Sequence, residues 1–142
     1  MNINARAFLI AVASALLAGG HAAAHHSFAA EFDAQKPLTL KGTVVKWEMM
    51  NPHGWITIDV TGPDGKKTQW MVETSNPNGL MRLGWTKRSL KPGDEITIDA
   101  YQAKDGSNTA NAARATLADG RKVFAGVPGT PSGPPAAPAQ DK

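Results

Sequence analysis

The chain has 142 residues, with 15 Lys and Arg against 12 Asp and Glu, which gives a formal net charge of +3 at neutral pH. This surplus of positive charge is too small to form the basic surface that binds nucleic acid, so nucleic acid is not an expected partner. Since the chain contains no cysteine, disulfides, thiolate metal sites and cysteine nucleophiles are excluded as well.

Residues 1–24 have the pattern of a secretory signal peptide. One arginine and no acid precede an apolar run over 7–18, and Ala22 and Ala24 provide the small residues expected at −3 and −1. The run is too short to cross a hydrocarbon core of ~30 Å. We therefore expect a cleaved signal peptide, a periplasmic protein with no membrane span in its mature part, and His25 as the first mature residue.

The mature chain would contain three histidines, His25, His26 and His53. An N-terminal histidine can chelate a metal ion through its α-amine and its ring, because both can lose a proton near neutral pH. Together with the ring of His53 or His26, these groups would form a three-nitrogen site suited to Cu(II). Zinc would also bind, although it usually takes four tetrahedral ligands. The alternative is that His25 and His26 form an exposed chain start with no metal partner.

An N-terminal arm over 25–36 is followed by a single domain over 37–125. Strands are expected wherever β-branched residues cluster or polarity alternates, over 38–49, 55–60, 67–74, 95–101 and 110–117. Gly42 is expected to mark a bulge or bend in the first of them.

A short helix is expected between the third and fourth strands, capped by Ser75 or Asn76 and with Pro77 in its first turn. A tight turn precedes the short segment 121–124. Residues 126–142 are rich in Pro, Gly and Ala and are expected to form a disordered tail.

Three strands, a short helix and two further strands follow one another in the OB-fold, a small five-stranded barrel with its helix between strands three and four. We therefore expect a mainly β, OB-like barrel. An open β-sandwich with one helical turn is the alternative, and the pattern of residues does not separate the two.

The loop between the first two expected strands carries His53 between a proline and a glycine. In OB-folds this loop and the loop between strands four and five, here 102–109, border the ligand face. Asn51 and Trp55 are therefore expected on that face, where the Trp55 indole could stack on a sugar or another ring.

Other side chains could contribute to such a site. The thioethers of Met49 and Met50 are soft ligands that could assist in holding reduced copper, although core packing is the more ordinary role of methionine. Four acids could lie nearby: Glu31, Asp33, Glu48 and Glu73. Their spacing indicates no glycosidase pair, and no hydrolase or phosphate-loop motif is present.

Several segments together resemble one family of small exported bacterial proteins, which is known only as a domain of unknown function. They include His25–Asp33 (HHSFAAEFD), Asn51–Ile56 (NPHGWI) and Leu117–Lys122 (LADGRK). The resemblance covers about 25–125 and implies an exported single domain but no activity. His25 and His53 also resemble, more loosely, the histidine braces of periplasmic copper carriers and copper-dependent polysaccharide oxygenases.

These observations favour an exported protein that binds copper through His25 and His53, with assistance from His26. The alternative is a module that binds a small ligand, a glycan or a protein at the face near Trp55. An enzyme is not expected. A copper oxygenase in particular is disfavoured, because the domain is small and has only Tyr101 and few Phe for an aromatic substrate platform.

Overall fold

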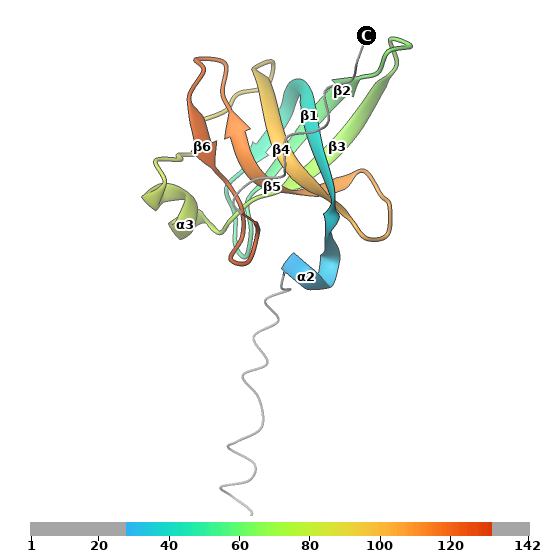
Figure 1. Cartoon of the computed structure of the whole chain (residues 1–142). Coiled ribbons are helices and arrows are strands. Elements are labelled where there is room, and N and C mark those ends of the chain that lie inside the picture. Colours follow the sequence, from blue (N-terminus) through green and yellow to red (C-terminus); the bar gives the residue numbers. More distant parts are fainter. Residues whose placement is uncertain (1–27, 132–142) are drawn as a thin grey trace, which may run out of the picture.

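The structure is a computed structural model that describes residues 28–131 (Figure 1). The expected signal peptide, His25, His26 and residues 132–142 lie outside this range. Within it, the elements are α2 (Phe28–Glu31), β1 (Phe32–Glu48), β2 (Trp55–Thr61), β3 (Lys67–Glu73), α3 (Pro77–Arg82), β4 (Glu95–Ala103), β5 (Thr109–Thr116) and β6 (Lys122–Phe124).

The strands form one sheet in the order β3-β2-β1-β4-β5-β6, and β3 pairs in addition with β5. That pairing is parallel and closes β1 to β5 into a ring, whereas the other pairings are antiparallel. The mainly β architecture is confirmed, and the ring is compatible with the predicted OB-like barrel. It also carries a strand beyond the five predicted, β6, whose three residues are too few to produce a pattern of alternation.

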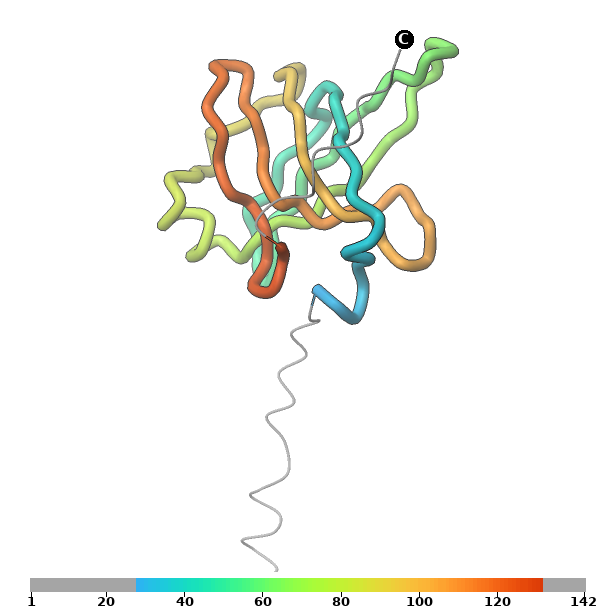
Figure 2. Tube along the Cα trace, in the orientation of Figure 1, coloured from blue at the N-terminus to red at the C-terminus, as the bar shows by residue number. Residues whose placement is uncertain are grey.

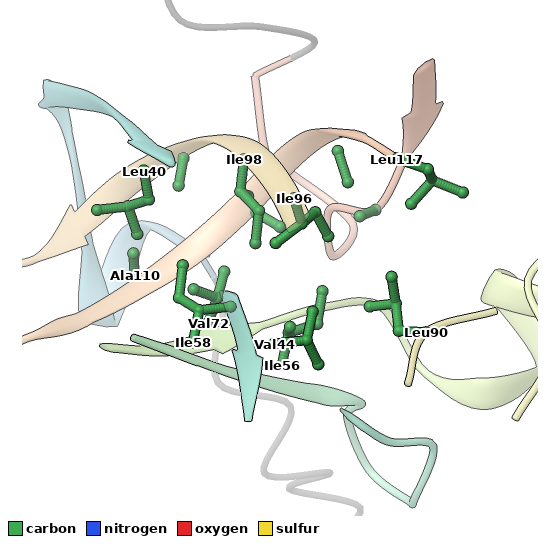
Figure 3. Close-up of a cluster of buried hydrophobic side chains, with 14 of the residues drawn as sticks. Leu40, Val44, Ile56, Ile58, Val72, Leu90, Ile96, Ile98, Ala110 and Leu117 are labelled. Atoms are coloured by element: carbon green, nitrogen blue, oxygen red, sulfur yellow. The ribbon is translucent and has the colours of Figure 1, made fainter. Parts of the chain in front are cut away.

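The core lies inside the ring and is built from alternate residues of the strands. Ile56 and Ile58 of β2 and Ile98 of β4 have no exposed surface. Figure 3 shows the side chains of this cluster pointing toward one another from facing strands. The alternation predicted for the second strand thus corresponds to its buried face.

The predicted helix is present as α3. The Oδ1 atom of Asn76 accepts a hydrogen bond from the backbone N–H of Gly79 at 2.8 Å, so Asn76 rather than Ser75 is the cap. Leu80 is its buried residue, and it packs into the core beside Trp85. The indole Nε1 of Trp85 donates to the carbonyl oxygen of Phe124 at 3.0 Å, which joins this region to β6.

Both ends of the described chain pack on the outside of the ring. β1 begins at Phe32, within the segment expected to be an arm, and Phe32 is 3% exposed. Residues 126–131 were expected to belong to a disordered tail, yet Val127 is 4% exposed. The sequence does not predict the burial of Val127, because one apolar residue hardly changes the average hydropathy of a segment rich in Pro and Gly.

Gly42 lies where β1 passes from β4 to β2, since its neighbour Thr43 pairs with both strands. A Cβ at Gly42 would stand 2.5 Å from the carbonyl oxygen of Asp59. The shifts of register in this strand lie elsewhere, between Phe32 and Pro37 and between Val44 and Lys46. Gly42 is therefore required for the close approach of two backbones.

We expect Gly42→Ala to lower the free energy of unfolding by roughly 1–3 kcal/mol, because the new methyl group meets backbone that cannot move aside. Urea unfolding of the variant would measure this loss. Gly62→Ala is the matched control, since its Cβ would stand 3.0 Å from the side-chain oxygen of Asp64 and no closer than 3.6 Å to backbone, at the carbonyl oxygen of Lys66. Equal stability of the two variants would contradict the role of Gly42.

Candidate functional site

A row of four side chains crosses the outer face of the ring from β2 to β4. In the register of the strands, Trp55 lies opposite Glu73, Glu73 opposite Asn111, and Asn111 opposite Tyr101. Their sequence neighbours point into the core, so these four point outward. The row brings together residues from four strands, including one pair that meets only because β3 joins β5.

The row is covered at the Tyr101 end by the first described residues. The ring of Phe28 makes an edge contact with Tyr101 at 5.3 Å between centroids. Phe28, Phe32 and Val127 form a second apolar cluster with Tyr101, outside the main core. This cover explains why Asn111 has no exposed surface although it lies on the outer face of the sheet.

His53 lies beside Glu73, in the loop just before β2. Its Nδ1 atom stands 3.4 Å from Oε1 of Glu73, and the two side chains are 13% and 7% exposed. Within residues 28–131, this Nδ1 atom is buried and has no hydrogen-bond partner. A buried polar atom without a hydrogen bond is costly, and it marks a place where a ligand could bind.

The backbone around Gly54 holds His53 in place. The N–H of Gly54 donates to the carbonyl oxygen of Ser75 at 3.0 Å, and its own carbonyl accepts from Thr74 at 2.8 Å. A Cβ at Gly54 would stand 2.5 Å from Oγ1 of Thr74. The loop predicted to be stiff is thus fixed to the end of β3, directly beside Glu73.

A chain of polar contacts leads from Glu73 to the C-terminal segment. Asn111 donates from Nδ2 to Oε2 of Glu73 at 3.3 Å, and the hydroxyl of Thr130 donates to Oδ1 of Asn111 at 2.6 Å. Asn111 therefore holds the buried Glu73 carboxylate, and Thr130 in turn holds Asn111. Such support fixes the orientation of a group far better than a single contact does.

A hollow of about 330 Å³ lies between Trp55 and the cluster around Tyr101, with Phe32 and Ala103 in its lining. Its wall includes Trp55 and the loop between β4 and β5, which sequence analysis placed on one ligand face, and Figure 2 shows this loop and α2 at the same end of the molecule. The hydrogen bond from Ser107 holds the pKa of the Asp105 carboxyl below its usual value. The hollow therefore carries a carboxylate at neutral pH. Its lining residues are Ala30, Glu31, Phe32, Trp55, Ala103, Lys104, Asp105, Ser107 and Thr109.

The other residues suggested by the sequence lie apart from this hollow. Asn51 is exposed in its loop and is not part of the wall. Met49 lines a different, apolar hollow with Met81 and Trp85, and Met50 is 46% exposed. Binding of a metal or ligand by any of these residues stays a prediction.

No three side chains of His, Asp or Glu within 28–131 are grouped so as to hold a metal ion. The described part of the proposed copper site is the single ring of His53, with the carboxylate of Glu73 beside it. Sequence reasoning did not single out Asn111 or Thr130, because one lies in an alanine-rich strand and the other in a segment rich in Pro and Gly. Only the pairing of β3 with β5 brings Asn111 to Glu73.

The fold and these residues belong to a known but uncharacterised class of proteins. Residues 12–112 match a family of unknown function (DUF6152), so the chain is a member of that family, in agreement with the resemblance of its motifs. No curated protein matches the chain. The helices described between residues 28 and 131 are too short or too polar to span a membrane.

Tyr101 provides a direct test of the cover on the outer face, because it is the only tyrosine in the chain. Burial raises the pKa of its hydroxyl above the ordinary value of 10.0. The phenol therefore ionises more readily in the unfolded chain than in the folded protein. The stabilisation that the neutral, buried phenol gives to the fold is complete below about pH 10 and is lost as the pH rises through the pKa of the folded protein. We expect Phe28→Ala to lower this pKa toward 10, as measured by phenolate absorbance. The same titration midpoint in both proteins would show that Phe28 does not cover the ring.

Proposed function

We propose that this protein is exported to the periplasm and binds a transition-metal ion through His25 and His53, with copper as the first candidate. The observation that carries the proposal is the buried Nδ1 atom of His53, which has no hydrogen-bond partner in the described range and faces the Glu73 carboxylate. A neutral imidazole is a common ligand for copper and zinc. The rigid loop around Gly54 would present it without further ordering.

The place where the chain enters the domain supports a contribution from His25. Phe28 contacts Tyr101, which lies two strands from Glu73 in the row, a separation of about 10 Å at the usual strand spacing. His25 precedes Phe28 by three residues, and three residues of extended chain also span about 10 Å. The distance therefore allows the α-amine and ring of His25 to meet His53.

A site of this composition suits binding rather than catalysis. Two ring nitrogens and an amine favour Cu(II), which stands at the top of the divalent affinity series. Storage, delivery or protection against excess copper are the roles we propose, with His26 as an assisting ligand. No enzymatic step is proposed.

The exported, untagged protein is expected to begin at His25 and to retain one Cu(II) in native mass spectrometry. His25→Ala and His53→Ala should each weaken Cu(II) binding by at least about 100-fold, since each removes a ligand rather than an outer partner, whose loss costs 10–100-fold. Competition with a chromophoric chelator would measure these affinities. The intact mass of every variant shows where it was cleaved.

Glu95→Gln is a matched control, because Glu95 accepts a hydrogen bond from Thr43 and lies six residues, about 20 Å of strand, from Tyr101. Its Cu(II) affinity should equal that of the wild type. A mature protein that begins at another residue, or unchanged affinity in His25→Ala, would overturn the proposed chelate.

The second candidate function is the binding of a small polar ligand in the hollow beside Trp55. The specific observation is that the indole, the Asp105 carboxylate and the hydroxyl-bearing residues Ser107 and Thr109 line one space. An aromatic face with polar groups around it suits a sugar, which has an apolar face and hydroxyls at its edge.

For this candidate we expect Trp55→Ala to abolish binding of di- and trisaccharides, because the stacking surface is lost, while His25→Ala leaves binding unchanged. Isothermal titration calorimetry over a panel of such sugars would make the measurement. Sugar binding that survives in Trp55→Ala would exclude the hollow as the site.

A further inference from the structure

We propose that the apolar hollow beside α3 binds a small anionic amphiphile, an alkyl chain that ends in a carboxylate, with the chain inside the hollow and the carboxylate at Lys87. The inference goes beyond the proposed function, because this hollow shares no residue with the proposed metal ligands or with the hollow beside Trp55. Figure 1 shows α3 and the loop between β4 and β5 on opposite sides of the ring. The methionine hollow, as we call it, is lined by Met49, Pro77, Met81, Trp85, Thr86 and Lys87.

The walls of the methionine hollow suit an apolar chain. Its volume is about 300 Å³, which lies at the lower end of the range of small-molecule sites. Met81 projects into solvent with 56% of its surface exposed, and Met49 lies across from it in the same lining. Thioether side chains are flexible and polarisable, so they can follow the shape of a chain that enters between them. Such binding removes the apolar surface of both partners from water.

The Trp85 wall of the hollow is held in place by contacts on its other side. Its indole Nε1 donates to the carbonyl oxygen of Phe124 at 3.0 Å, and its ring lies 5.4 Å from that of Trp47 between centroids. Trp47 in turn donates from Nε1 to the carbonyl oxygen of Thr86 at 3.0 Å. A wall that is already ordered lowers the entropic cost of binding a ligand.

The segment that forms most of the methionine hollow is positively charged. Residues 74–93 contain no Asp or Glu. Their cations are exposed, and none of them forms an ion pair with another residue within 28–131. The acid that precedes Met49, Glu48, is already paired with Lys46 at 2.7 Å. The positive potential therefore favours an anion and disfavours a cation. The cations of 74–93 are Arg82, Lys87, Arg88 and Lys91.

The position of Lys87 indicates an amphiphile rather than a wholly apolar ligand. Among the lining residues described within 28–131, only Lys87 is charged. A carboxylate at the end of a bound chain can therefore pair with the Lys87 ammonium while it stays in contact with water. A bilayer surface fits this site less well than a single chain, because a flat surface cannot fill a hollow.

The test uses the mature protein without added metal, and octanoate below its micellar concentration as the probe. With ¹³C-methyl methionine in the protein, NMR reports on each thioether separately. We expect octanoate to shift the Met49 and Met81 methyl signals and to leave that of Met71, which lies on β3 outside the hollow, in place. The wild type should bind octanoate about 2- to 5-fold more tightly than octanol, as one exposed charge pair allows, and octyltrimethylammonium more weakly than either.

Substitutions test the two parts of the site separately. Met81→Glu should weaken octanoate binding by at least about 10-fold, because it places a like charge beside the carboxylate. Met71→Glu is the matched control, since Met71 is exposed to a similar degree, 47%, and its variant should bind octanoate as the wild type does. Lys87→Gln should reduce the affinity for octanoate to that for octanol.

Several results would overturn the proposal, and the first two need no variant. They are octanol binding as tightly as octanoate, and a shift of the Met71 signal in place of those of Met49 and Met81. Equal octanoate affinity of Met81→Glu and the wild type would exclude the hollow as the site. A protein that ignores octanoate but sediments with vesicles of phosphatidylcholine and phosphatidylglycerol would show that the occupant is a membrane surface. A dimer that Met81→Glu dissociates would show that it is a second copy of the chain. Each of these results leaves the proposed metal binding intact.

Discussion

The parallel pairing of β3 with β5 is the constraint on which the rest of this structure depends. It involves only three residue pairs, from Met71 with Thr109 to Glu73 with Asn111. Without it the strands would form an open sheet, and the apolar faces of β2 and β4 would not face each other across one core. The same pairing sets Asn111 beside Glu73, so closure of the ring and assembly of the candidate site are one event.

The two ends of the described chain convert an outer sheet face into a second buried layer. Phe28 and Val127 pack on Tyr101 and Ala113, and β5 is consequently buried on both faces along 110–113. Small alanine side chains let the covering segments approach closely. Polar groups buried there must be hydrogen-bonded, which accounts for the connected contacts of Glu73, Asn111 and Thr130.

This arrangement places the two candidate functions on one surface. His53 and Trp55 are two residues apart, yet the first lies beside the buried carboxylate and the second lines the open hollow. The residue whose ring nitrogen is buried and unpartnered in the described range therefore lies two positions in the chain from the wall of a hollow of about 330 Å³. Membership of a family of unknown function leaves the activity to be decided by the chemistry of these residues.

The sequence by itself determined the mainly β class, the positions of the strands and of the capped helix, and the stiff loop that carries His53, because alternation, caps and turns are local properties of the chain. It also indicated that Trp55 and the loop between β4 and β5 would lie on one face. Only the tertiary structure decided that β3 meets β5, that Phe28 and Val127 cover Tyr101, and that Glu73 lies 3.4 Å from His53. These contacts join residues up to about a hundred positions apart in the chain, and no local pattern records such partners.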